Sequence, residues 1–260
     1  VDRLKNRPVV EHASNLGAII AFSMAQALNI PAFICDSVSV DEFEPIARIS
    51  GMKDIERKSF VHALNTRAVA IKTARDMGRE FKDLNLIVAH LGGGISISVI
   101  RNGKIIDIVS DDEGPFSPER SGRVPCKDLM NMCYQNDKAV VSKKMRGKGG
   151  LVSYLGTNSA LEVEAMIKAG DQYAKLIYEA MAYQIAKGIG ELATVVDGQV
   201  DAIIITGGIA YSEFITSRIK KSVGFIAPVK IVPGENELEA LALGTLRVLK
   251  GEEKANEYTE

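Results

Sequence analysis

Three consecutive glycines after a run of branched apolar residues are the first place in this sequence where chemistry can be expected. The stretch 84–89 predicts a buried strand, and His90 and one leucine lead from it into Gly92, Gly93 and Gly94. Because glycine has no Cβ, such a turn can point backbone N–H groups at an anion such as a phosphate. Taken alone, the triplet predicts a plain hairpin turn equally well.

A second glycine turn, ITGGIAYSEF, carries Gly207 and Gly208 where a predicted strand passes into a predicted helix. Backbone N–H groups at the start of a helix favour phosphate groups, so this turn suits a nucleotide. It lacks the third glycine of the dinucleotide fingerprint, and the sequence has no GxxxxGK[ST] motif, which argues against a Rossmann or P-loop protein. We expect the two turns to lie on different sheets and to hold a nucleotide between two lobes.

Asp36 and His62 are candidate site residues because of the elements expected around them. Asp36 ends a short apolar stretch that reads as a strand, and ligands of α/β proteins bind at such strand ends. The alternative for Asp36 is a turn carboxylate that caps the next segment. His62 lies near the start of a long predicted helix, where a partly buried, hydrogen-bonded histidine is the alternative to a catalytic one.

Arg120 and Glu237 are the remaining candidates. The loop EGPFSPERSGRVP combines prolines and glycines with Arg120 and Arg123, so a stiff backbone carries two guanidinium groups. Such a loop is suited to hold an anion, although a solvated charge is the default for any one surface arginine. Glu237 opens the last predicted helix, where a carboxylate favours the helix dipole whether or not it binds a ligand.

Strands and helices alternate along the chain, which predicts an α/β architecture with helices covering the sheets. A β-meander is expected over 84–109, with a hairpin turn at Asn102 and Gly103. The other expected strands are 32–36, 201–208 and 228–234, and the expected helices are 15–29, 54–81, 126–134, 138–146, 170–196, 212–221 and 237–250.

The composition argues against several classes of function. The 260 residues are 46% apolar, and 32 basic against 33 acidic side chains give a net charge of −1. Without a strong field of either sign, no nucleic acid and no membrane is expected as a partner, and small molecules are favoured. No uninterrupted apolar run is long enough to span a bilayer. Three cysteines without a CxxC pair, and three histidines, predict no structural zinc site and fit a reduced, cytoplasmic setting.

Taken together, the motifs resemble those of the butyrate kinases, in the acetokinase branch of the acetate and sugar kinase, Hsc70 and actin superfamily. The resemblance covers nearly the whole chain and rests on segments in the family's order: EHASNLGAIIA, IPAFICDSVSVDEFEPIARISG, ERKSFVHALN, LIVAHLGGGISIS, DEGPFSPERSG, GKGGLVSYLGTN, ITGGIAYSEF and ENELEALALG. It implies a two-lobed actin-like, ribonuclease H-like fold. It also implies reversible, ATP-dependent phosphorylation of butyrate or a branched short-chain acid to an acyl phosphate and ADP, with Mg²⁺, by a homo-oligomer.

The resemblance also implies roles for the candidate residues. His90 with Gly92 to Gly94 matches a phosphate turn, and Gly207 and Gly208 match the adenosine turn. Four further side chains match roles closer to the reaction. His62 matches a histidine near the transferring phosphoryl group, and Arg120 matches a loop arginine. Asp36 matches an acidic residue of the phosphate and magnesium region, and Glu237 matches a late carboxylate linked to magnesium.

The predicted domains are a first lobe made of residues 1–40 and 236–260 and a second lobe, 41–235, that carries the nucleotide-binding turns. Kinases of the superfamily begin with a strand and hairpin that contact phosphate, and no such segment precedes Val1, so the first lobe is expected to be incomplete. Two alternatives to a kinase therefore stay open. One is a nucleotide-binding regulatory remnant, and the other is an actin-like or chaperone-like ATPase.

Overall fold

The computed structural model describes residues 14–235 and 237–256, which form two compact units. Unit 1 consists of the residues up to Ser37 together with those from Glu237 onward, and unit 2 spans 38–236. Residues 1–13, 236 and 257–260, which fall in the predicted first lobe, lie outside the described residues. The two units are described separately below.

Within its described residues, unit 1 has two helices, α2 (Ser14–Leu28) and α10 (Glu237–Leu249), which the sequence predicts. The predicted strand ending at Asp36 is wrong, because the segment 32–37 has no strand geometry and Asp36 has a φ of 41°. A strand needs a hydrogen-bonded neighbour, and the described strands pair with one another inside unit 2. The thiol of Cys35 packs against Gly244 of α10, where any larger residue would collide with it.

Unit 2 is built on a five-stranded sheet. Its strands are β1 (Leu86–Leu91), β2 (Ile95–Arg101), β3 (Lys104–Ser110), β4 (Ala202–Gly207) and β5 (Val229–Pro233), in the order β3-β2-β1-β4-β5. The first three strands form the predicted antiparallel meander, and β4 and β5 continue the sheet parallel to β1. The predicted α/β architecture is confirmed.

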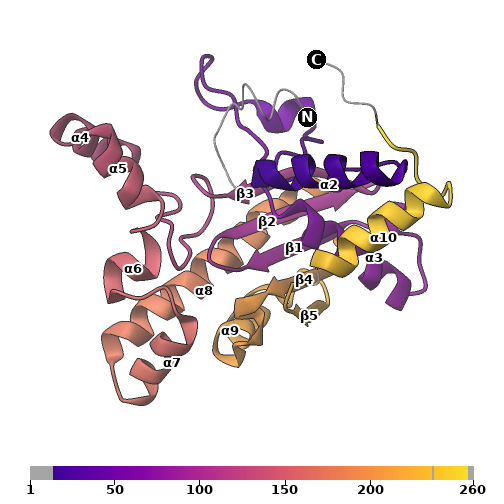
Figure 1. Cartoon of the computed structure of the whole chain (residues 1–260). Coiled ribbons are helices and arrows are strands. Elements are labelled where there is room, and N and C mark those ends of the chain that lie inside the picture. Colours follow the sequence, from indigo (N-terminus) through magenta and orange to yellow (C-terminus); the bar gives the residue numbers. More distant parts are fainter. Residues whose placement is uncertain (1–13, 236, 257–260) are drawn as a thin grey trace. The chain divides into compact units, whose positions relative to one another are not determined.

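Helices cover both faces of this sheet (Figure 1). Because side chains alternate along a strand, Ile87 and Ala89 of β1 face the long helix α8 (Gln172–Ala193), whereas Leu86 and Val88 face α3 (Ala63–Asp76). The remaining helices of the described residues in unit 2 are η1 (Pro45–Arg48), η2 (Phe81–Asp83), α4 (Cys126–Gln135), α5 (Lys138–Met145), α6 (Gly150–Leu155), α7 (Ala160–Lys168), η3 (Thr194–Val196), η4 (Gly208–Tyr211) and α9 (Glu213–Val223).

Two parts of the expected helix pattern differ in the structure. The helix expected from residue 54 begins only at Ala63. Two further helices are not predicted from the sequence: α6, within the glycine-rich stretch after Arg146, and α7, directly after that stretch. The start of α7 is stabilised by Ser159, whose hydroxyl accepts a hydrogen bond from the backbone N–H of Glu162. Among the residues that the structure describes, no helix is long and apolar enough to cross a membrane.

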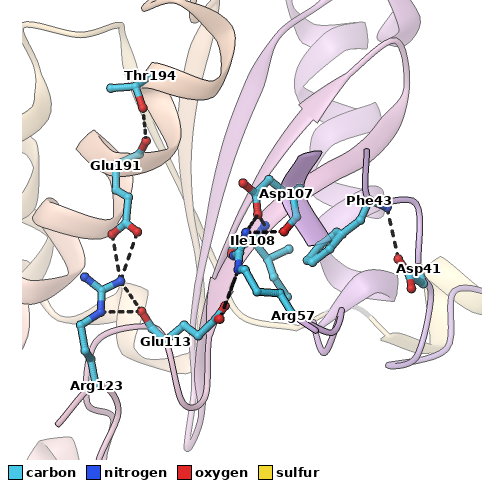
Figure 2. A network of polar contacts seen from close by, with 10 residues as sticks. Asp41, Phe43, Arg57, Asp107, Ile108, Glu113, Arg123, Glu191 and Thr194 are labelled. Atoms are coloured by element: carbon cyan, nitrogen blue, oxygen red, sulfur yellow. Dashed lines mark hydrogen bonds and ion pairs between the residues drawn. The ribbon is translucent and has the colours of Figure 1, made fainter. Parts of the chain in front are cut away.

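Arg57 lies along the outer edge of β3 (Figure 2). Its Nη2 donates to the backbone oxygen of Ile108 at 2.7 Å, and its guanidinium group pairs with Asp107 at 2.9 Å and Glu113 at 3.0 Å. An edge strand otherwise presents unpaired backbone groups to solvent. Arg57 therefore satisfies one of these groups and ties the edge of the sheet to the residues that follow β3.

Arg123 extends this network to α8 (Figure 2). Its Nε donates to the backbone oxygen of Glu113 at 2.9 Å, and its guanidinium group pairs with Glu191 of α8 at 3.0 Å. The loop between Glu113 and Arg123 is consequently held at both ends. This loop carries Arg120, one of the predicted site residues.

Candidate functional site

The register of the sheet places three polar side chains in one row across neighbouring strands. His90 of β1 lies opposite Ser96 of β2 on one side and opposite Thr206 of β4 on the other. All three residues are buried. Since His90 follows Leu86 and Val88 at two-residue spacing, its side chain points to the same face as theirs. The row therefore lies on the face covered by α3, at the end of β1 that leads into the glycine turn.

The start of α3 brings two further polar side chains to this row. His62 directly precedes the helix, and its Nδ1 lies 2.8 Å from the hydroxyl of Ser96. Its ring stacks on that of His90 with 3.9 Å between the centroids. One turn later, the amide nitrogen of Asn65 lies 2.9 Å from Nδ1 of His90 and 3.4 Å from the hydroxyl of Thr206.

These contacts determine which ring nitrogen of His90 carries the proton. With the Asn65 amide donating to Nδ1, neutral imidazole carries its proton on Nε2. That nitrogen lies 3.0 Å from a carboxylate oxygen of Glu235, so His90 donates a hydrogen bond to Glu235. His62 and His90 were predicted separately, and the structure brings them into direct contact.

Both histidines are neutral at physiological pH. Burial, with smaller contributions from His90 and Arg120, lowers the pKa of His62 to about 3. Burial lowers the pKa of His90 to about 4. Two stacked imidazoles therefore serve as hydrogen-bonding groups in this site and not as cations.

We expect the free energy of unfolding to fall between pH 7 and pH 5 by about 2 kcal/mol for each of these histidines. In the unfolded chain they bind protons near pH 6.5, whereas the folded ones bind them only near pH 3 to 4. Acid therefore favours the unfolded state, and this loss is absent above about pH 7. Urea unfolding at both pH values measures the effect. His62→Asn is the control, since it keeps all other titrating groups; an equal pH dependence in variant and wild type would contradict the expectation.

The glycine turn between β1 and β2 is closed by its own backbone and by the arginine loop. The N–H of Gly92 donates to the backbone oxygen of Gly94 at 3.0 Å, and the hydroxyl of Ser117 donates to the backbone oxygen of Gly93 at 2.7 Å. The guanidinium group of Arg120 lies against Gly94, where a Cβ would come within 2.7 Å of its central carbon. The turn and Arg120 were predicted as separate features and form one site.

A buried carboxylate holds Arg120 in this place. Asp111 has a φ of 49° and is 8% exposed, and its Oδ1 lies 3.2 Å from Nη1 of Arg120. Its other oxygen forms an ion pair with Arg146, whose backbone also bridges to that of Arg120. Two arginines share one carboxylate, so the group keeps a net positive charge beside the glycine turn.

The second glycine turn follows β4 of the same sheet and lies at the same end of the strands as the first turn. Because β1 and β4 are adjacent and parallel, the turns that follow them are neighbours, and Gly207 packs against the backbone of Leu91. The expectation of two separate sheets is therefore wrong. After Gly207 the chain passes into η4 and then α9, as predicted for a strand leading into a helix; Gly208 is the first residue of η4.

Asp36 and Glu237 belong to unit 1 and are described within it. The Cys35 thiol lies 3.8 Å from a carboxylate oxygen of Asp36, and Glu237 is the exposed first residue of α10. In the described ranges, no group of three or more histidine, cysteine, aspartate or glutamate side chains is placed to hold a metal ion. Mg²⁺ bound together with a phosphate needs only one or two carboxylates, because water and phosphate oxygens complete its shell. Glu235, beside the glycine turn, suits that mode.

Several residues of this site are not among those predicted from the sequence. Ser96 and Thr206 were detectable, because a polar residue stands out in a strand that is otherwise apolar. Asn65, Asp111 and Glu235 carry no such signal, since each lies in a polar or mixed segment.

Comparisons with known proteins show which family profile and which folds this chain resembles. Residues 52–236 match the profile of the Acetokinase family. A crystal structure of acetate kinase from Porphyromonas gingivalis is similar, with a TM-score of 0.80 and 22% identity over 95% of this chain and 70% of that one. A propionate kinase from Francisella tularensis subsp. tularensis SCHU S4 has a TM-score of 0.72 and 20% identity, over 88% of this chain and 68% of that one.

A third similar structure is the acetate kinase from Entamoeba histolytica, with a TM-score of 0.69 and 18% identity over 79% of this chain. The matched regions make up 63% of that chain. At these identities the likeness establishes a shared fold, and it confirms the predicted α/β kinase fold.

Proposed function

The chain belongs to the acetokinase family, and from this premise we propose that it transfers a phosphoryl group between ATP and a short-chain carboxylic acid. The products are ADP and an acyl phosphate, and the reaction is reversible. The observation that carries the proposal is the contact between Arg120 and Gly94, which puts a fixed cation on a turn suited to phosphate.

The chemistry of this reaction matches the charges in the site. A carboxylic acid is already ionised at neutral pH, so its attack on phosphorus needs no general base. The obstacle is repulsion between two anions, and positioned cations and hydrogen-bond donors relieve it. Arg120 supplies the cation. In this proposal the hydroxyl of Ser96, 2.8 Å from Nδ1 of neutral His62, donates to that nitrogen, so that Nε2–H of His62 is left as a donor toward the transferring phosphoryl group.

His90 and the glycine turns would hold the nucleotide in this proposal. The turn at Gly92, Gly93 and Gly94 has no side chains of its own to keep phosphate oxygens away, and Gly207 and Gly208 begin the turn toward the adenosine. Asp36 acts as a magnesium-linked carboxylate, not as a proton acceptor, because no proton has to be removed from the acid.

Mg²⁺ would be held by Asp36 and Glu237, directly or through water, and when bound it neutralises charge on the phosphates. The roles of these two residues rest on the family resemblance of their sequence motifs. The same resemblance supports butyrate or a branched analogue as the acid and a homo-oligomer as the working form. It also supports a first lobe of residues 1–40 and 236–260 and a second lobe of residues 41–235.

A hydroxamate assay tests the proposal. The purified chain is incubated with ATP, Mg²⁺, hydroxylamine and a panel of short-chain acids, because hydroxylamine traps acyl phosphates as coloured hydroxamates. Hydroxamate that depends on butyrate or branched acids is the expected result. ATP binding without turnover would instead indicate a nucleotide-binding remnant, and ATP hydrolysis that is independent of acid would indicate an actin-like or chaperone-like ATPase.

A further inference from the structure

We infer that Glu235 makes this site selective for phosphate ligands that carry a divalent cation. The inference rests on the proposed function, since it assumes that ATP phosphates bind at the Gly92 to Gly94 turn. It concerns a residue to which neither the sequence motifs nor the family match assigns a role.

Glu235 is held over the glycine turn by the backbone before it. Gly234 and Gly207 exchange two backbone hydrogen bonds, at 3.0 and 3.3 Å, which fix the chain at the end of β5. From there the Glu235 carboxylate reaches His90 Nε2 at 3.0 Å and lies 3.4 Å from the place where a Cβ on Gly92 would be. The carboxylate thus stands where an anion on the turn would have to come close.

A closed ring of contacts fixes His90, the hydrogen-bond partner of the Glu235 carboxylate. The Thr206 hydroxyl donates to the backbone oxygen of Gly234 at 3.3 Å and lies 3.4 Å from the Asn65 amide nitrogen. Asn65 donates to Nδ1 of His90, and Nε2 of His90 donates to Glu235, the neighbour of Gly234. With Nδ1 occupied and the ring stacked on a second imidazole, His90 has one N–H to offer, and Glu235 accepts it.

A phosphate on the turn meets two obstacles from this arrangement. It competes with Glu235 for the single N–H of His90, and the carboxylate repels it across a short distance. His90 is buried and neutral, so it brings no positive charge to offset this repulsion. With a divalent cation, the repulsion between carboxylate and phosphate is replaced by attraction, because both groups can then share the ion, directly or through water.

The test compares ATP binding with and without Mg²⁺. Isothermal titration calorimetry gives the Kd of wild type, Glu235→Gln and Glu235→Ala for ATP in EDTA and in Mg²⁺. Removing the charge is expected to tighten metal-free ATP binding about tenfold and to reduce the ratio of the two Kd values, as suits a partly screened charge at this distance. Glu80→Gln is the matched control, since it removes an exposed carboxylate elsewhere in unit 2 and should leave both Kd values unchanged.

The outcomes separate the inference from the function on which it rests. If wild type binds ATP and both Glu235 variants, with unchanged melting temperatures, keep the wild-type ratio of Kd values, the role of Glu235 is refuted. If wild type binds ATP neither in EDTA nor in Mg²⁺, the proposed function itself fails. A tenfold gain in metal-free affinity that both variants share supports the inference, because the two substitutions have in common only the loss of charge.

Discussion

Replacing Arg120 by alanine is expected to lower kcat of the proposed kinase reaction by about 10²- to 10³-fold while changing the Kd for ATP by only a few-fold. The guanidinium group lies on the glycine turn and is held there by Asp111, so it is positioned before any ligand binds. Charge that builds up during phosphoryl transfer benefits most from such a fixed cation. Steady-state kinetics with ATP and the acid identified by the hydroxamate assay, together with calorimetry, measures both quantities.

The matched control for this prediction is Arg123→Ala, which removes a guanidinium group from the same loop. Arg123 is 54% exposed and pairs with Glu191 of α8, away from the glycine turn. We expect kcat of this variant to stay within about twofold of wild type, as is usual for exposed ion pairs. Equal losses in the two variants would show that the loop as a whole, and not Arg120, supports the reaction.

A second route displaces Arg120 without removing it. A Cβ on Gly94 would come within 2.7 Å of the guanidinium group, which is the flexible end of its side chain and can move aside. Gly94→Ala should therefore fold normally and lower kcat, but add little to the loss in an Arg120→Ala background. Full additivity of the two substitutions would mean that Gly94 acts on the phosphate directly.

The elements that carry this site follow from local patterns in the sequence. The apolar run of β1, the Asn102 and Gly103 turn and the long periodic stretch of α8 each have a signal within a few residues. Where the signal is weak or needs a partner, the prediction fails. The short helix α6 is flanked by glycines, which mask its helical pattern. Among the described residues, the apolar stretch before Asp36 has no neighbouring strand to pair with.

The site itself was predictable only as separate pieces. His62, His90 and Arg120 stand out by residue type and motif, but the stacking of the two histidine rings and the contact of Arg120 with the glycine turn depend on tertiary structure. The register of β1 between β2 and β4 puts Ser96 and Thr206 beside His90, and a shift by one residue would turn all three side chains to other partners. Asp111 and Glu235 acquire their significance from distances that sequence spacing does not encode.

Because β4 lies directly beside β1, Gly207 is expected to be the least replaceable residue of the two turns. Its φ is 89°, and a Cβ there would come within 2.7 Å of the carbonyl carbon and 2.8 Å of the amide nitrogen of Leu91. Both contacts are with backbone in the neighbouring strand β1, which cannot move without breaking the sheet. Backbone strain and overpacking together predict that Gly207→Ala lowers the free energy of unfolding by roughly 2 to 5 kcal/mol.

Gly208→Ala is the control for this prediction, because it adds the same methyl group one residue later. Gly208 has no positive φ, and no heavy atom of the described chain lies within 4 Å of its Cβ position. Its stability should stay within about 1 kcal/mol of wild type. Urea unfolding compares the two variants, and equal stabilities would contradict the expected contact with β1. A loss confined to Gly207→Ala would show that the turn at Gly207 is packed against the strand that carries His90, so that the two glycine turns form one structural unit.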